Sequence, residues 1–366
     1  MRVLILTGPD SESQRAVSRA LQLAFTARGD TCLVVGALAL LGLHPTLSQI
    51  RTLEEALYSP RGFAFLSANG SFIREGKRKS AVYEVNARFA EQLRTFLHEG
   101  EFDAVLCLHR YTAEAVSHIR KTLAFSARCC YVSCDYACVP FLEETRLDHY
   151  FTAHESFASA YTTRGISKKA ILPAGIPLPA DWFRDEEKAD ARALLNLPQH
   201  MPCYFIPYAE NTIAAVDALL GCIRNEDGRV CVVSPDGAPP RSPFIARYAG
   251  DIRVEVLAPE DPLSLYCAAC DVMLTAPSGA LSAVAAVCGK PLVHLPSQDP
   301  FEAQSAVYFS ARGMSLTGKD EEACAALAVS LEEDRSAKEA MREAQTKIRN
   351  PDAAQRVVRF LHEGRL

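Results

Sequence analysis

The strongest constraint on the fold is a stretch between residues 252 and 313 in which short apolar runs alternate with helical segments. Apolar runs of strand length occupy residues 254–257, 272–274 and 292–295, and a helix of small residues, 281–287, precedes the last of them. This alternation predicts parallel strands joined by helical crossovers. A ligand is expected at the carboxyl ends of such strands.

The turn Pro277-Ser278-Gly279 leads directly into that helix. The first backbone N–H groups of a helix and the positive end of its dipole favour an anion, and a diphosphate is the obvious ligand. The alternative is purely structural, with Ser278 capping a core helix and Gly279 making the turn. The turn by itself leaves both interpretations open.

Composition narrows the possible functions. The chain has 366 residues, 49% of them apolar, which is enough for two domains of ordinary size. Its formal net charge of −5 does not favour a nucleic-acid partner. No apolar run approaches the roughly 20 residues of a membrane-spanning helix, and the first residues resemble a strand rather than a signal peptide. We therefore expect a cytoplasmic protein, at most peripheral on the inner face of the cell membrane.

The 13 cysteines are spread through predicted strands and helices, where reduced cysteine behaves as a small hydrophobe. One cluster contains Cys129, Cys130, Cys134 and Cys138, but it lacks the paired spacing of zinc and iron–sulfur sites. We therefore expect neither a metal nor a cofactor.

The first half of the chain opens with a βαβ pattern. Strands are predicted at residues 2–6 and 32–35, and between them lies an amphipathic helix, 11–28, whose apolar side includes Leu21 and Leu23. The loop between the first strand and this helix should lie at the ligand edge of the sheet.

Two side chains suited to acid–base chemistry follow later strands. His109 follows the strand predicted at residues 104–108, and Asp135 follows the strand predicted at 130–133. Parallel strands deliver functional side chains at their carboxyl ends, and either residue fits a general base that activates a hydroxyl. The alternative is that each caps the segment that follows it.

Residues 44–80 are less regular and mix aromatic with basic side chains. Such a segment could dock on an anionic lipid surface, or its aromatic residues could fold back onto the core. The residues concerned are Phe63, Phe65, Phe72, Arg74, Lys77, Arg78 and Lys79.

The order of these parts resembles the GT-B glycosyltransferases, and more narrowly the family of monogalactosyldiacylglycerol synthase and processive diacylglycerol glucosyltransferase. The family has T-H-P-F where this chain has Leu108-His109-Arg110-Tyr111, and T-D-Y where it has Cys134-Asp135-Tyr136. The family segment D-v-x-x-x-K-P-G-G-L-T-x-x-E-A-L-A-x-G-x-P, followed by P-x-x-G-Q-E-x-x-N, is also matched in part. The matching positions there are Asp271, Pro277, Gly279, Gly289, Pro291, Pro296 and Glu302.

The chain also departs from the family pattern. A lysine, a glycine, an acidic residue and an asparagine of the family are replaced by Ala276, Ser278, Val284 and Ser305. The glycines and histidine of the first loop are replaced by Asp10, Glu12 and Ser13, and the phosphate loop at residues 208–212 has no glycine.

The resemblance implies an α/β architecture of the GT-B type, with two Rossmann-like domains whose parallel sheets face each other across a cleft. We expect an acceptor-binding domain at residues 1–182 and a nucleotide-sugar-binding domain at 183–350. A C-terminal helix at 351–366 could pack back on the first domain.

The resemblance further implies an inverting transfer of a sugar from a UDP-sugar to a lipid hydroxyl such as that of diacylglycerol. Asp135 or His109 would be the general base, and no metal is implied because a helix terminus takes the place of a cation. The donor would be held by Leu257, Ala258 and Pro259 at its base, by Ser278, Gly279 and Ala280 at its diphosphate, and by Glu302 and Gln304 at its sugar.

Two other functions remain open. The chain could be a catalytically inactive relative that binds a nucleotide-sugar or a partner protein, which Val284 and Glu210 would favour. It could also be an epimerase of the UDP-N-acetylglucosamine type, but that chemistry needs a set of cleft carboxylates that the sequence does not provide. Retention of His109, Asp135 and Glu302 favours the transferase.

Overall fold

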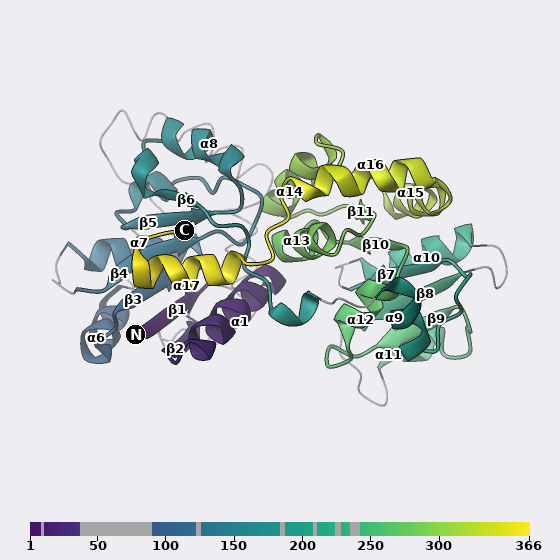
Figure 1. The fold of residues 1–366 in the computed structure, drawn as a ribbon, viewed down its shortest axis with the longest axis horizontal. Helices are drawn as coiled ribbons and strands as arrows, with labels where there is room; N and C mark the ends of the chain where they lie inside the picture. The colour runs from purple at the N-terminus through teal and green to yellow at the C-terminus, as the bar shows by residue number, and fades with distance from the viewer. Residues whose placement is uncertain are drawn as a thin grey trace. The chain divides into compact units, whose positions relative to one another are not determined.

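The computed structural model describes residues 1–8, 11–36, 90–121, 126–183, 187–207, 211–223, 228–234 and 242–366, without the side chains of residues 91 and 92. Contacts divide the chain into two compact units (Figure 1). Unit 1 comprises Met1–Pro179, Gln298–Phe301 and Asn350–Leu366, and unit 2 comprises Ala180–Ser297 and Glu302–Arg349. The boundary expected from the sequence was residue 182.

Unit 1 is built on a six-stranded parallel sheet in the order β2-β1-β3-β4-β5-β6. The central strands are buried on both faces, which is why they are nearly continuous apolar runs in the sequence. The strands are β1 (Arg2–Thr7), β2 (Thr31–Gly36), β3 (Ala104–Cys107), β4 (Arg128–Val132), β5 (His149–Thr152) and β6 (Ile171–Pro173).

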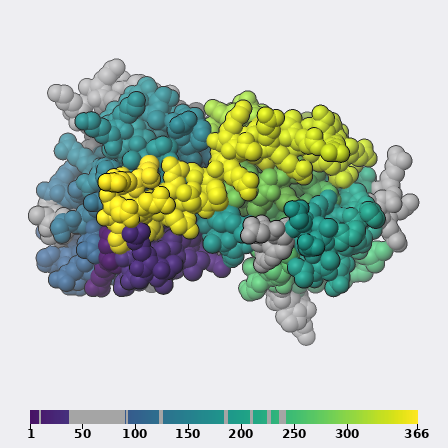
Figure 2. Space-filling model, in the orientation of Figure 1, coloured from purple at the N-terminus to yellow at the C-terminus, as the bar shows by residue number. Residues whose placement is uncertain are grey.

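The helices of unit 1 include one from the end of the chain. These helices are α1 (Glu12–Ala27), α6 (Ala90–Gly100), α7 (Arg110–Ile119), α8 (Ala158–Thr163) and α17 (Ala353–Glu363). Helix α17 packs against α1, and Figure 2 shows its yellow atoms beside the purple atoms of the N-terminal segment. Arg128 fixes its C-terminal end by donating to the Leu361 carbonyl at 3.1 Å, and the Phe360 ring lies 4.7 Å from that of His149.

Unit 2 has a second six-stranded parallel sheet, in the order β12-β11-β10-β7-β8-β9. Its strands are β7 (Cys203–Ile206), β8 (Arg229–Val233), β9 (Val254–Leu257), β10 (Val272–Thr275), β11 (Leu292–His294) and β12 (Leu316–Thr317). Its helices are α9 (Lys188–Leu194), α10 (Thr212–Cys222), α11 (Pro243–Tyr248), α12 (Leu263–Ala269), α13 (Gly279–Val287), α14 (Pro300–Ser310, of which the first two residues are assigned to unit 1), α15 (Glu321–Glu333) and α16 (Arg335–Thr346).

The predicted α/β class with two Rossmann-like sheets is confirmed, because both sheets are parallel and covered by helices. One packing prediction is wrong. Leu23 is 51% exposed, and the buried side of α1 instead includes Val17, Leu21 and Phe25. The buried side of that helix also contains small polar residues, among them Ser13 and Ser18, which blur the apolar pattern.

Candidate functional site

In unit 1 three polar loops meet at one edge of the sheet. Strand β1 pairs with β2 on one side and β3 on the other, so the chain reverses its direction of travel across the sheet at β1. Ligands bind outside the carboxyl ends of parallel strands at such a switch point. Gly8, His109 and Asp135 follow β1, β3 and β4, and therefore lie at this edge.

His109 is the N-cap of α7, and its side chain is only partly exposed. Its Nδ1 accepts a hydrogen bond from the backbone N–H of Tyr111 at 3.2 Å. Burial, together with the positive charge of Arg110, lowers the pKa of His109 to about 3. The imidazole is therefore neutral at physiological pH, and because Nδ1 is an acceptor its single proton lies on Nε2.

Gly8 makes room for this histidine. A Cβ atom added at Gly8 would lie 2.4 Å from Cγ of His109 and 2.8 Å from its Nδ1. The Gly8 backbone N–H donates to the Gln14 side-chain oxygen at 2.7 Å, which ties the loop to the first turn of α1. The sequence did not single out Gly8, although a glycine directly after the first strand of a βαβ unit is the available signal.

Asp135 is half-buried at the same edge. Its Oδ1 accepts a hydrogen bond from the hydroxyl of Ser13 at 3.4 Å, and its backbone carbonyl accepts one from Ser133 at 2.9 Å. Glu12, in the first turn of α1, suits the positive end of the helix dipole. Asp10, the other acidic residue of this loop, lies outside the described residues.

Helix α7 is linked to the loop after Asp135 by a buried arginine. Arg110 is 2% exposed, forms an ion pair with Glu114 at 3.4 Å, and donates to the Pro140 carbonyl at 3.3 Å. Its guanidinium also lies over the Phe141 ring, 5.8 Å from the centroid. A buried charge needs such partners, so Arg110 holds the two loops that bear His109 and Asp135 in one arrangement.

In unit 2 the corresponding switch point lies between β7 and β10, because the chain moves to β8 and β9 before it returns to β10. Ser278 follows β10 and is the N-cap of α13, its hydroxyl accepting from the Leu281 N–H at 3.3 Å. Gly279 and Ala280 are the first helical residues, and both are buried. Ser278 thus has the predicted capping role, at the edge where a ligand is expected.

The loop after β9, proposed for the nucleotide base, makes internal hydrogen bonds. The Leu257 carbonyl accepts from the Ser234 N–H at 2.9 Å, and the Ala258 N–H donates to the Asp261 carboxylate at 2.7 Å. Pro259 has no N–H to offer. A nucleotide base at this loop would therefore compete with Asp261 for the Ala258 N–H, or would donate to a second lone pair of a backbone carbonyl.

The residues proposed for the sugar follow β11. Glu302 is half-buried at the start of α14, and its Oε2 accepts from the Ser297 hydroxyl at 2.6 Å. Gln304 is half-buried two residues further on, whereas Ser305 is fully buried. Val284 is 1% exposed inside α13, where an aliphatic side chain offers no hydrogen bond to a ribose hydroxyl.

Asp271, another position shared with the family, lies at the opposite edge of the sheet, just before β10. Its Oδ2 accepts from the Arg192 guanidinium at 2.6 Å and from the Cys203 N–H at 2.8 Å. Lys188 pairs with its other oxygen. Asp271 therefore anchors α9 to the sheet and does not face the ligand edge.

The aromatic and basic residues proposed for membrane contact, Phe63, Phe65, Phe72, Arg74, Lys77, Arg78 and Lys79, lie outside the described residues. Within the described ranges, none of the helices combines the length and the apolar character needed to cross a bilayer. The same part of the chain contains no group of three or more His, Cys, Asp or Glu side chains arranged to hold a metal ion.

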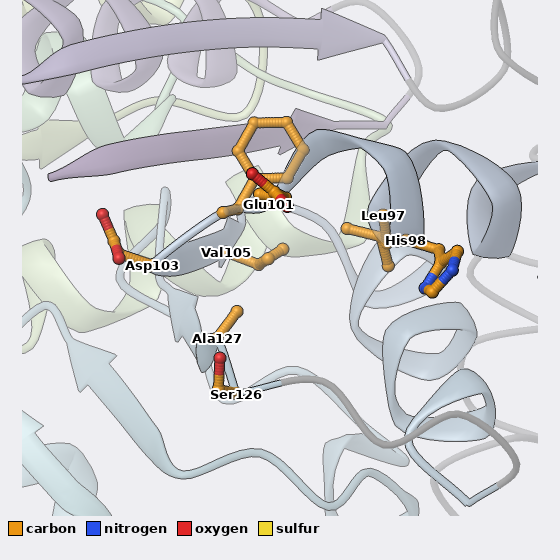
Figure 3. A pocket seen from close by; sticks show the side chains of 8 residues that line it. Leu97, His98, Glu101, Asp103, Val105, Ser126 and Ala127 are labelled. Atoms are coloured by element: carbon orange, nitrogen blue, oxygen red, sulfur yellow. The ribbon is translucent and has the colours of Figure 1, made fainter.

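A cavity of 740 Å³ lies away from this site (Figure 3). Its lining includes Asp103, just before β3, and Ala127, just before β4. It therefore opens at the amino-terminal edge of the sheet, opposite to His109 and Asp135.

Comparison with known proteins agrees with this arrangement. Residues 14–178, a range that includes His109 and Asp135, match the family model described as monogalactosyldiacylglycerol (MGDG) synthase. No curated protein matches the chain by sequence.

Three solved structures of similar fold illustrate the architecture. The kitacinnamycin glycotransferase has a TM-score of 0.64 at 11% identity, with 100% of this chain and 99% of that chain covered. The glycosyltransferase SnogD from Streptomyces nogalater has a TM-score of 0.58 at 16% identity, with 99% of each chain covered. The UDP-GlcNAc 2-epimerase from Neisseria meningitidis has a TM-score of 0.59 at 14% identity, with 99% of this chain and 100% of that chain covered. The fold is thus of the GT-B type, and residues 14–178, a little under half of the chain, resemble the MGDG synthase family.

Proposed function

We propose that the chain transfers a sugar from a UDP-sugar to the hydroxyl of a diacylglycerol-like lipid, with inversion at the anomeric carbon. The observation that carries this proposal is the group formed by Gly8, Ser13, His109 and Asp135 at the switch point of unit 1. Of these residues, His109 and Asp135 lie in the part of the chain that matches the family model. This group offers one carboxylate and one neutral imidazole, and the backbone of Gly8 lies close against the imidazole.

Asp135 is the better candidate for the general base. An ionised carboxylate can accept the proton of an attacking hydroxyl. His109 has its Nδ1 bonded to Tyr111 and its proton on Nε2, so it can donate a hydrogen bond but has no free lone pair in the ring. We therefore assign proton acceptance to Asp135 and orientation of the acceptor or of the sugar to His109.

On the donor side we propose the N-terminus of α13 as the diphosphate site. The buried Ser278 cap fixes the start of the helix, and the helix dipole would favour the charge that develops on the leaving diphosphate. Glu302 and Gln304 are proposed to bind the sugar hydroxyls. The reaction would then be a single displacement in which the lipid oxygen attacks as the diphosphate leaves.

The lipid acceptor implies that the protein reaches a membrane surface. We propose that the aromatic and basic residues between Phe63 and Lys79 make that contact, since apolar and cationic side chains together bind anionic lipid headgroups. Association with vesicles of anionic lipid, compared with neutral vesicles, tests this part of the proposal.

A transfer assay with UDP-glucose or UDP-galactose and diacylglycerol vesicles tests the chemistry. Asp135→Asn should lower kcat by about 10²–10⁴-fold, the usual contribution of a general base. His109→Ala should lower it by a smaller factor, whereas Asp190→Asn, on the surface of α9, should leave it unchanged. Full activity in Asp135→Asn would overturn the assignment of the base.

Binding without transfer would support a different function. A chain that binds UDP-sugars but transfers no sugar to any hydroxyl acceptor would be a non-catalytic relative, as Val284 suggests. Conversion of UDP-N-acetylglucosamine without an acceptor would instead indicate an epimerase, the activity named for one of the similar structures.

A further inference from the structure

A buried histidine contacts both helices that are proposed to bind the donor. His294 is the last residue of β11, at the carboxyl end of that strand, and its side chain is 0% exposed. Strand β11 lies between β10 and β12 in the sheet of unit 2. The transfer reaction proposed above gives His294 no role, and the sequence did not single it out.

The imidazole is held at both of its nitrogen atoms. Its Nε2 lies 3.0 Å from the hydroxyl oxygen of Ser282, in α13, and its Nδ1 lies 3.1 Å from that of Ser315, just before β12. The centroid of the Phe309 ring, in α14, is 5.4 Å from that of the imidazole, and the two rings meet edge to face. Both serines are buried as well. His294 is therefore a fixed point in the core to which α13 is attached.

The hydrogen bonds of the imidazole are complete when the ring is neutral. Burial lowers the pKa of His294 to about 3, so the ring carries a single proton at physiological pH. A neutral imidazole has one N–H donor and one nitrogen acceptor, whereas a serine hydroxyl can donate or accept. One serine therefore donates to the ring and the other accepts from it, so that neither ring nitrogen is left without a partner in the core.

Ser282 connects the histidine to the proposed diphosphate site. It lies one helical turn after Ser278, and its backbone N–H donates to the Ser278 carbonyl at 3.0 Å. A serine hydroxyl inside a helix often bonds to the carbonyl four residues earlier, which bends the helix. In α13 that carbonyl belongs to Ser278. The bond to His294 directs the Ser282 hydroxyl away from it and leaves the carbonyl to the backbone N–H.

We propose that His294 is a positioning residue for the donor site, because through Ser282 it fixes the first turn of α13. The inference rests on the proposed function, since it concerns the same helix terminus. Backbone N–H groups bind an anion only within about 2.7–3.2 Å, so a first turn that moves by a fraction of an ångström holds a diphosphate less well. His294 is itself fully buried and acts only through α13.

The two serines provide a matched pair of variants. Ser282→Ala and Ser315→Ala each leave one nitrogen of the same buried ring without its partner. We therefore expect similar downward shifts of the urea midpoint in the two variants. Only Ser282→Ala detaches α13 from the ring. In Ser315→Ala the ring keeps its bond to Ser282 and its contact with Phe309.

Titration calorimetry of the full chain with UDP measures the consequence for the donor site. We expect Ser282→Ala to weaken UDP binding by about three- to tenfold, which corresponds to the loss of one hydrogen bond that orders the site. Ser315→Ala should leave the affinity unchanged. His294→Phe keeps an aromatic ring but removes both nitrogen atoms, and it should weaken UDP binding as Ser282→Ala does.

Amide hydrogen exchange of the ligand-free protein gives a second measurement. Peptides that cover the first turn of α13 should exchange faster in Ser282→Ala than in Ser315→Ala, because the turn opens locally once it is detached from the ring. A purely structural role of His294 in the core would instead raise the exchange of this turn equally in both variants.

The outcomes separate this inference from the proposed function. Equal affinity for UDP in the two serine variants, or equal exchange of the first turn of α13, would overturn the positioning role while the proposed donor site stands. Absence of UDP binding by the unchanged protein would overturn the donor site, and this inference with it.

Discussion

Replacing Gly8 by alanine tests the geometry proposed for the acceptor side. The added Cβ would lie 2.4 Å from Cγ and 2.6 Å from Cβ of His109, which is closer than carbon atoms approach in folded proteins. The histidine cannot simply rotate away, because the contact includes its own Cβ and because its Nδ1 caps α7 through Tyr111. Either the first loop or His109 must move.

The cost follows from two contributions. Overpacking of a tight contact costs about 1–3 kcal/mol. Loss of a side-chain cap costs about 1 kcal/mol more if His109 leaves its position. We therefore expect Gly8→Ala to lower the free energy of unfolding by about 2–4 kcal/mol, the sum of these two contributions. Because a misplacement of about 1 Å can lower catalysis about a hundredfold, we expect sugar transfer to fall by about ten- to a hundredfold.

Urea unfolding and the transfer assay measure the two effects separately. Gly221→Ala is the matched control, because a Cβ at Gly221, in the last turn of α10, meets no atom within 4 Å. That variant should be neutral or slightly stabilising, since alanine favours helix more than glycine does. Unchanged stability and unchanged transfer in Gly8→Ala would refute the close packing of Gly8 on His109.

Three further predictions concern unit 2. Burial lowers the pKa of His294 to about 3, so on acidification the unfolded state takes up a proton at a higher pH than the folded state does. Lowering the pH from 7.5 to 5 should therefore remove about 2 kcal/mol of unfolding free energy. In urea titrations at the two pH values, His294→Gln should lose correspondingly less stability than the unchanged protein. Asp271→Ala leaves the 2%-exposed Arg192 without its carboxylate and should lower the free energy of unfolding by about 3–5 kcal/mol, whereas the surface variant Asp190→Ala should change it little. A loss below about 1 kcal/mol for Asp271→Ala would contradict its anchoring role. Asp261→Ala frees the Ala258 N–H and should therefore tighten UDP binding by about three- to tenfold, as measured by calorimetry. Equal or weaker binding by this variant would argue against a nucleotide base at this loop.

The sequence predicted the sheets well because their strands are short apolar runs buried on both faces. Val272–Thr275, for example, is buried along its whole length and is bounded by polar or turn residues. It also placed His109 and Asp135 at one edge, since position after a parallel strand determines the edge on which a side chain emerges. Leu23 was misplaced, because small polar residues share the buried side of α1.

Other features depend on contacts between distant residues and leave little local signal. Arg110 and Glu114 are four residues apart on a helix, a spacing typical of a solvent-exposed pair, yet both are buried. The contact of Gly8 with His109 joins residues about a hundred positions apart. The bond from Ala258 to Asp261 changes the hydrogen bonds that the loop can offer to a nucleotide, which no family motif indicates.

The central claim is that a UDP-sugar binds at the N-terminus of α13. Titration calorimetry of the full chain with UDP, UDP-glucose, UDP-galactose and UDP-N-acetylglucosamine tests it most directly, with Ser278→Asp as the paired variant. Aspartate is as good an N-cap as serine, so the variant should fold, but its charge would repel a diphosphate. Micromolar binding that Ser278→Asp abolishes is the predicted result. Failure of every ligand to bind, or binding that the added charge leaves unchanged, would contradict the account.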